Sequence, residues 1–253
     1  MGHEFEQHRE AGVPVSPEEA WQAIATGPGI DSWFMGRNEV QPGPGGAVRT
    51  AFGEYTPELP VTGWDPPRRF AYRSGEAPDG RFIAYEFLIE GRGPGSTVVR
   101  VVTSGFVPGD DWEDEYEAMT KGSDLYFATL TEYLTHFAGS FAVPVTAFGP
   151  PQAGWDHTRT MLCRELGLTA PGAPGDRARL VVADGTGAPA AGAVVYFSSA
   201  SALGLRSRDG LYRFIRGFGK PVVAAHHLFA PGADPRQAER DWESWLATLL
   251  APR

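Results

Sequence analysis

Residues 110–137 constrain the fold most, because their pattern predicts one long amphipathic helix. Apolar side chains recur at spacings of three and four, which places them on one side of a helix with 3.6 residues per turn. Asp110 or Asp111 is expected to cap the first turn. At about 1.5 Å per residue the helix would be roughly 40 Å long, so it must lie across a broad surface. Its apolar stripe comprises Trp112, Tyr116, Met119, Ser123, Tyr126, Phe127, Leu130, Leu134 and Phe137.

The sequence before this helix predicts a β-sheet that can serve as the broad surface under the helix. Between residues 40 and 106, short runs with alternating apolar residues are separated by Gly and Pro, which is typical of antiparallel strands. One side of the predicted sheet is apolar, and the helix would cover it. Gly122 and Ser123 interrupt the apolar stripe and leave space, so a cavity is expected between helix and sheet. The predicted strands span residues 47–55, 59–65, 68–74, 81–91 and 97–106.

The first 34 residues predict a strand followed by two short helices. The strand covers residues 5–15. Ser16 is expected to cap the first helix, with Pro17 at its first position and Glu19 completing a capping box. Residues 27–29 are expected to break this helix, and residues 30–34 form a second helical turn.

These elements carry a family resemblance in four motifs that follow one another in the expected order: VSPEEAWQAI, IDSWF, VTGWDPPRRFAYR and GSTVVRVVTSGF. Together with the long helix, residues 5–137 closely resemble the family of activator of heat-shock-protein-90 ATPase homologues, within the START-like or SRPBCC ligand-binding superfamily. The resemblance implies an α+β helix-grip fold, shared with the birch pollen allergen, in which a curved antiparallel sheet wraps a long C-terminal helix. It implies no fixed catalytic set.

Two domains are expected, at residues 1–138 and 139–253. The second half repeats the plan of strand, helix, strands and helix in shortened form, and its last helix is expected to be capped by Asp234. It resembles second domains of SRPBCC proteins, which predicts a degenerate START-like repeat in tandem. Charge also divides the chain: residues 1–138 hold 10 basic and 22 acidic residues (net −12), and residues 139–253 hold 12 and 9 (net +3), summing to −9. Packing between the domains is expected, with a homodimer as a further arrangement.

Composition and motifs argue against several functions. The acidic first half lacks the basic footprint of a nucleic-acid-binding protein. No apolar run suggests a signal peptide or a membrane span, so a cytoplasmic location is expected. Cys163 is predicted to be a buried small hydrophobe. His226 and His227 are neighbours in a predicted strand, so they point to opposite faces and cannot share a metal. One is expected in the core and one at the surface. No metal, cofactor or catalytic residues are expected.

The aromatic residues suggest a function. Those on the sheet face and helices suit a partly open apolar pocket for a lipid-like or polyketide-like molecule. Binding of such a molecule without catalysis is the main hypothesis. A polyketide aromatase/cyclase, with Tyr72, Tyr85 or Thr103 moving protons, is the first alternative. A chaperone-linked stress protein, suggested by the family name, is the second. The candidate ligand-binding residues are Trp33, Phe52, Trp64, Tyr72, Tyr85, Phe87, Trp112, Tyr116, Met119 and Phe127.

Overall fold

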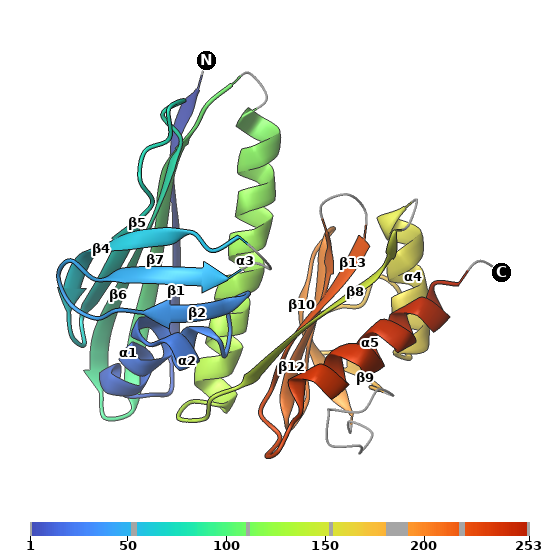
Figure 1. The fold of residues 1–253 in the computed structure, drawn as a ribbon. Coiled ribbons are helices and arrows are strands. Elements are labelled where there is room, and N and C mark those ends of the chain that lie inside the picture. The colour runs from blue at the N-terminus through green and yellow to red at the C-terminus, as the bar shows by residue number, and fades with distance from the viewer. Residues whose placement is uncertain are drawn as a thin grey trace. The chain divides into compact units, whose positions relative to one another are not determined.

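The chain forms two compact units. The computed structural model describes residues 2–51, 55–109, 112–151, 154–180, 192–217 and 221–251. Backbone contacts divide it into an N-terminal unit, Met1–Phe141, and a C-terminal unit, Ala142–Arg253. Each unit contains one antiparallel sheet and at least two helices, so the predicted α+β class is confirmed (Figure 1).

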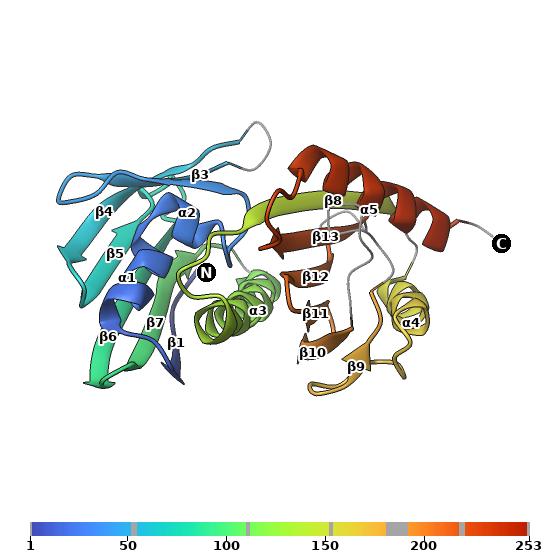
Figure 2. The same cartoon turned by 90° about the horizontal axis from the view of Figure 1, so that it is seen from below.

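The N-terminal unit is built on a seven-stranded sheet with the order β1-β7-β6-β5-β4-β3-β2. The first strand is therefore the neighbour of the last, and the others follow backward along the chain. The sheet curves around its helices, which is the predicted helix-grip arrangement (Figure 2). The elements are β1 (His3–Val13), α1 (Pro17–Ala25), α2 (Gly27–Ile30), β2 (Arg37–Val40), β3 (Ala47–Ala51), β4 (Glu58–Asp65), β5 (Arg69–Arg73), β6 (Phe82–Gly93), β7 (Ser96–Val107) and α3 (Trp112–His136).

Local sequence explains the start of α1 and corrects the prediction for α2. The Ser16 hydroxyl accepts a hydrogen bond from the Glu19 backbone N–H at 3.2 Å, and the Glu19 carboxylate accepts one from the Ser16 N–H at 2.8 Å. The predicted capping box is confirmed. The prediction that residues 27–29 only break the helix was wrong, because they belong to α2. Thr26 caps that helix, and a proline in a first turn interrupts no helical hydrogen bond.

The long helix α3 runs within the predicted bounds. Asp110 and Asp111, its expected caps, lie outside the described residues. Its C-terminal half is firmly packed: Leu130 and Leu134 are each 1% exposed. Tyr133 fixes the end of the helix by donating a hydrogen bond from its hydroxyl to the Ser140 carbonyl at 2.9 Å.

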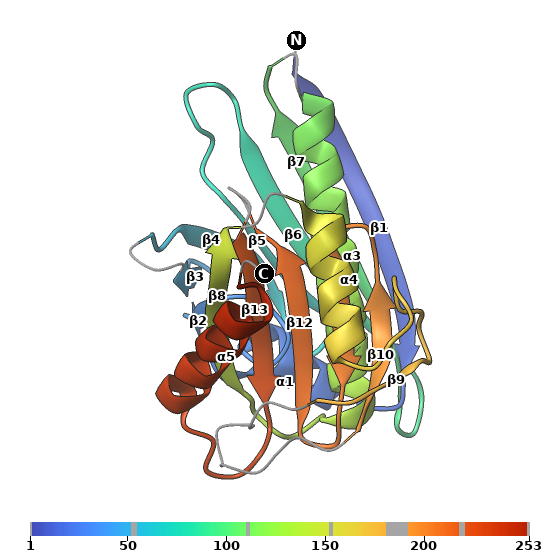
Figure 3. The ribbon, with the colours of Figure 1, turned by 90° about the vertical axis from the view of Figure 1, so that its right-hand side faces the viewer.

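The C-terminal unit has a six-stranded antiparallel sheet in the order β8-β13-β12-β11-β10-β9. Helices α4 and α5 cover one face of it (Figure 3). The Asp234 carboxylate accepts hydrogen bonds from the backbone N–H groups of Arg236 and Gln237, so the predicted cap of α5 is confirmed. The elements are β8 (Val143–Pro151), α4 (Trp155–Glu165), β9 (Arg177–Ala178), β10 (Ala193–Ser198), β11 (Ala202–Arg206), β12 (Gly210–Arg216), β13 (Pro221–Leu228) and α5 (Pro235–Leu249).

The two sheets share one winding plan. In each, the first strand pairs with the last, and each unit closes with a helix that lies against its first strand. This plan is what a tandem repeat predicts, and common ancestry of the units stays a prediction. The sequence did not separate β11 from its neighbours, and it did not indicate β2, which is only four residues long.

Candidate functional site

The concave face of the N-terminal sheet is fixed by strand register, because directly opposite residues on neighbouring strands point to the same side. One row across this face is polar. Gln7 of β1 lies opposite Thr103 of β7, Thr103 lies opposite Tyr85 of β6, and Tyr85 lies opposite Tyr72 of β5. The neighbouring positions on β6 and β7 are apolar or glycine, and pair Phe87 with Val101 and Ile83 with Gly105. On β1, the residue opposite Val101 is Arg9.

Aromatic rings on the sheet form a continuous array around this polar row. The Tyr72 ring centroid lies 5.2 Å from that of Tyr85 and 6.2 Å from that of Phe87. Phe70 lies 5.2 Å from Tyr72 and 5.4 Å from Trp64, by the same measure. The array therefore spans strands β4, β5 and β6.

The array continues from the sheet to the long helix. Trp33, which follows α2, has its ring centroid 6.1 Å from that of Phe87 and 5.3 Å from that of Phe34. Phe34 lies 4.7 Å from Tyr126 of α3. The Trp33 indole N–H donates to the Ala23 carbonyl at 2.9 Å, which fixes this ring to α1. Sheet, short helices and grip helix thus contribute to one aromatic surface.

The two tyrosines of the polar row have strongly shifted acidities. Burial raises the pKa of the Tyr85 hydroxyl to about 12, and the neighbouring Tyr126 adds to the shift. Burial also raises the pKa of Tyr72, with a further contribution from Tyr85. A raised phenol pKa means that the neutral form is favoured, so both groups remain protonated at neutral pH and act as hydrogen-bond donors.

Within the described part of the chain, the hydroxyls of Tyr72 and Tyr85 take part in no hydrogen bond. Tyr72 is nevertheless a buried residue, only 6% exposed, and Tyr85 is half-buried. Polar groups in such places are usually satisfied by a partner or by water. Within the described chain, these two hydroxyls therefore keep unused hydrogen-bonding capacity.

A polar clip from β1 holds the middle of α3. The Gln7 amide donates to the Thr120 hydroxyl at 2.5 Å, and the Arg9 guanidinium donates to the Asp124 carboxylate at 2.8 Å. Arg9 also donates to the Thr120 carbonyl at 3.2 Å and to the Gln7 side-chain oxygen at 3.1 Å. The Arg9 side chain is only 11% exposed, whereas the Asp124 side chain at the other end of this contact is 52% exposed. We refer to Gln7, Arg9, Thr120 and Asp124 as the β1–α3 clip.

Next to this clip the helix is not fully packed. A Cβ atom added at Gly122 would meet only the Tyr126 ring, at 4.0 Å. Among the strands, α3 comes closest to β1 and β7, which form one edge of the sheet. Met119 is half-buried, in contrast to Leu130 and Leu134, which lie about three and four turns further along. The apolar stripe of α3 is therefore less completely buried around Met119 than around these leucines.

The structure brings together half of the residues selected from sequence. The aromatic array includes Trp33, Trp64, Tyr72, Tyr85 and Phe87. Trp112 and Tyr116 form a separate group near the start of β1, where Trp112 stacks on His3 at 4.1 Å and Tyr116 contacts Phe5 at 5.6 Å, between ring centroids. Met119 and Phe127 have no ring contact with the array among the described residues, and Phe52 lies outside those residues.

Sequence reasoning missed several members of the site. Phe34 and Tyr126 are both aromatic and lie in predicted helical segments, so their composition was a usable signal. Phe70 was recognisable from its place in a predicted strand. Gln7 and Arg9 could not be recognised as site residues from the sequence. They occur in a strand with polar residues on both faces, where no local pattern distinguishes the concave side.

The C-terminal unit places its histidines differently from the prediction. His226 and His227 do point to opposite faces, but both are buried at 1% exposure, so the expected surface histidine was wrong. The His226 ring lies among Tyr212, Phe214 and Trp242, with its centroid 4.2 Å from that of Trp242. Burial and the nearby positive charge of Arg213 lower the pKa of His226 to about 3.

The remaining expectations concern metals, membranes and the cysteine. Cys163 is buried, as predicted. Among the described residues, no group of three or more His, Cys, Asp or Glu side chains is placed to bind a metal ion. None of the helices in that part of the chain combines the length and apolar character needed to cross a membrane.

The geometry can now be compared with known proteins. Residues 14–135 match the family described as Activator of Hsp90 ATPase homolog 1-like protein. The match covers nearly all of the N-terminal unit, from the end of β1 to the last turn of α3. The matched segment is similar to this family. It contains the whole polar row except Gln7, together with the aromatic array. No curated protein matches the sequence.

Solved structures with similar folds are distant relatives. A protein from Mesorhizobium loti is 21% identical over 51% of this chain and 96% of its own, with a TM-score of 0.44. The Aha1 dimer from Colwellia psychrerythraea is 21% identical over 51% of this chain and 96% of its own, with a TM-score of 0.41. DynU16, a protein of the dynemicin biosynthetic locus, is 16% identical over 96% of both chains, with a TM-score of 0.42.

Proposed function

We propose that the N-terminal unit binds an apolar or aromatic small molecule between the concave face of its sheet and the N-terminal half of α3. The observation that carries the proposal is that the Tyr72 and Tyr85 hydroxyls lie inside an aromatic array and form no hydrogen bond within the described chain. Small-molecule sites combine an apolar lining with a few convergent polar groups. The polar row within the aromatic array has that composition.

The open position at Gly122 supports the same site. A helix that only covers a sheet needs apolar side chains along its whole inner face. Here the stripe is interrupted beside the β1–α3 clip, and the neighbouring Met119 is half-buried. The clip anchors α3 through polar contacts to the edge strand β1, so the helix does not require close packing over the middle of the sheet.

The proposal is tested with fluorene, a flat tricyclic hydrocarbon, in equilibrium dialysis. Saturable binding to the full chain is expected. Replacing Met119 with Trp adds volume beside the open position and is expected to lower affinity on the order of tenfold, because overpacking a filled site costs roughly 1–3 kcal/mol. Met119→Leu conserves volume and serves as the control. Absence of saturable fluorene binding, or equal affinity in the Trp and Leu variants, would contradict this location.

A second experiment identifies the natural ligand class. Native mass spectrometry of the protein purified from its own host is expected to show a bound apolar compound in addition to the polypeptide mass. The mass of a retained molecule would distinguish a lipid-like from a polyketide-like ligand. A spectrum of Met119→Trp prepared in parallel is the control, since it should retain less of the same compound.

The alternative functions have less support. A polyketide aromatase/cyclase requires a group that removes a proton, and the raised pKa of Tyr85, about 12, keeps that phenol protonated at neutral pH. It can donate a hydrogen bond but is a poor general base. A chaperone-linked role follows only from the family description. A pull-down with an Hsp90-type chaperone that recovers this chain would favour that role over small-molecule binding.

A further inference from the structure

The polar row on the concave face is unusual for a surface that would bind only hydrocarbon. Its four members come from four adjacent strands, and the flanking positions on β6 and β7 are apolar or glycine. A purely apolar ligand that covered such a hydroxyl would displace the water bound to the hydroxyl and offer no hydrogen bond in its place, which costs free energy. A ligand that covers this row therefore needs polar atoms at the matching position.

The members of the row differ in whether their side-chain polar atoms form hydrogen bonds with other residues of the protein. Gln7 is bonded on both sides, through its amide to Thr120 and through its oxygen to Arg9. Tyr72 and Tyr85 have no such bonds within the described residues, although their rings lie only 5.2 Å apart between centroids. Both side chains leave neighbouring strands at directly opposite positions, so their rings lie on the same face as neighbours. The unsatisfied part of the row is thus a pair of adjacent phenols.

We propose that Tyr72 and Tyr85 together recognise an oxygen acceptor on the ligand, such as the carbonyl of a flat aromatic ketone or a polyketide. The proposal rests on the function proposed above and specifies the ligand class. Each phenol donates one hydrogen bond to the oxygen, while the surrounding rings contact the apolar frame. No covalent step takes place, and neither tyrosine loses its proton.

Two further observations agree with donation by the phenols. The raised pKa values of both hydroxyls keep them protonated across the physiological range, as a hydrogen-bond donor requires. Tyr126 of α3 lies close enough to Tyr85 to influence its pKa, so the helix side of the site also carries a phenol. An acceptor oxygen placed at the row would be shielded from water by aromatic side chains, which strengthens its hydrogen bonds.

The test compares 9-fluorenone with fluorene. The two share a flat tricyclic frame, and only fluorenone carries a carbonyl oxygen. Because Tyr→Phe removes a hydroxyl and keeps the ring, Tyr72→Phe and Tyr85→Phe are each expected to weaken fluorenone binding about threefold to tenfold, and the double variant more. Fluorene binding should change by less than about twofold, since it makes no such hydrogen bond. Tyr55→Phe, which alters an exposed tyrosine, is the control.

An independent readout comes from the ligand itself. The infrared carbonyl stretch of bound fluorenone is expected at lower frequency than in hexane, and it should shift back in Tyr72→Phe/Tyr85→Phe. If both probes bind the parent protein and the Phe variants weaken them equally, the recognition of oxygen is wrong while the apolar site stands. If neither probe binds, the site and the inference both fail. An unshifted carbonyl band in the parent protein would also overturn the inference.

Discussion

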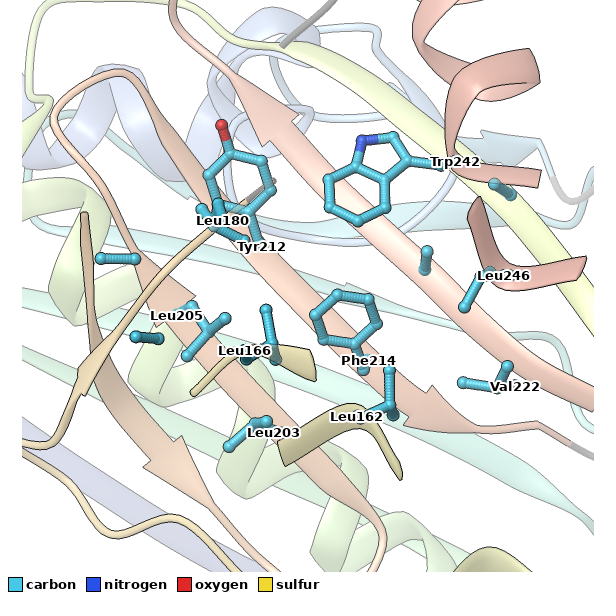
Figure 4. Packing of buried hydrophobic residues seen from close by; sticks show 14 of the residues in the cluster. Leu162, Leu166, Leu180, Leu203, Leu205, Tyr212, Phe214, Val222, Trp242 and Leu246 are labelled. Atoms are coloured by element: carbon cyan, nitrogen blue, oxygen red, sulfur yellow. The ribbon is translucent and has the colours of Figure 1, made fainter. Parts of the chain in front are cut away.

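The interiors of the two units are filled to different degrees, although both place helices on one face of an antiparallel sheet. In the C-terminal unit, Tyr212, Phe214 and Trp242 are each 0% exposed and lie among leucines from both helices and the sheet (Figure 4). In the N-terminal unit, Trp64 and Tyr85 face the helices but are only half-buried. The same layering thus supports a close-packed core in one case and a partly open aromatic surface in the other.

The difference concerns how the closing helix of each unit is attached to its sheet. Helix α5 carries Trp242 and Leu246 into a continuous hydrophobic cluster, so its attachment depends on packing. Helix α3 has ring contacts near its start, the β1–α3 clip and the buried Leu125 in its middle, and buried leucines toward its end. We expect binding in the N-terminal unit, and a mainly structural role for the core of the C-terminal unit.

The largest effect is expected from removing one tryptophan from each interior. Trp242→Ala should lower the free energy of unfolding of the C-terminal unit by about 3–5 kcal/mol, because it leaves a large cavity in a close-packed core. Trp64→Ala should cost less than half as much, since the Trp64 side chain is already partly exposed to solvent. Denaturant unfolding of the full chain, followed by circular dichroism, measures both. Equal costs would show that the two interiors are packed alike.

The two units should also lose folding stability at opposite ends of the pH scale. The folded state holds His226 neutral with its pKa lowered to about 3 from 6.5. Between those values the unfolded chain takes up a proton that the folded chain does not, so stability falls by about 1.4 kcal/mol per pH unit as pH drops from 6.5 toward 3. His226→Gln, which can still accept from the Arg213 N–H, should lack this contribution.

The N-terminal unit has the opposite dependence at alkaline pH. The pKa of Tyr85 is raised from 10 to about 12, so folding favours its neutral form. The stability that this contributes is complete below pH 10 and is lost as pH rises through 12. Tyr85→Phe should flatten the alkaline limb of the stability profile and leave the acid limb unchanged. If His226→Gln and Tyr85→Phe altered the same limb, the separation between the units would be wrong.

The sequence predicted those parts of the fold that depend on neighbouring residues. The bounds of α3, the capping box at Ser16 and the cap at Asp234 follow from helical periodicity and from side chains three residues apart. The alternation of Tyr85 and Phe87 with polar neighbours identified the concave face of β6. These signals are local, so one sequence is enough to detect them.

The parts that could not be predicted depend on contacts between distant segments. The polar row requires Gln7 to lie opposite Thr103, a register set by the pairing of β1 with the last strand of its sheet. The expected surface histidine was wrong because strand alternation places neighbouring side chains on two faces but does not show how exposed each face is. Tyr72, Tyr85 and Thr103 were named from sequence as polar candidates, but Gln7, the alignment of all four in one row and the clip were not predicted.

A smaller effect is expected from the β1–α3 clip. Arg9→Ala removes hydrogen bonds to Gln7, Thr120 and Asp124 and should destabilise the N-terminal unit by about 1–2 kcal/mol. Hydrogen exchange should increase in the N-terminal half of α3 and stay low around Leu134. Arg100→Ala is the matched control on the adjacent strand, because Arg100 pairs with Glu10 but is 43% exposed, and such pairs contribute about 0–1 kcal/mol. Equal exchange in the two variants would mean that the clip does not anchor α3.

The smallest change tests the open position directly and should have opposite signs in the two units. Gly122→Ala adds a Cβ that meets nothing nearer than 4.0 Å, so the higher helix propensity of alanine should raise stability by about 0.5–1 kcal/mol. Gly204→Ala places a Cβ 2.6 Å from the Tyr196 ring and should lower the stability of the C-terminal unit. Thermal unfolding measures both shifts. A destabilising Gly122→Ala would show that the space beside α3 is already filled, which removes the room that a ligand needs.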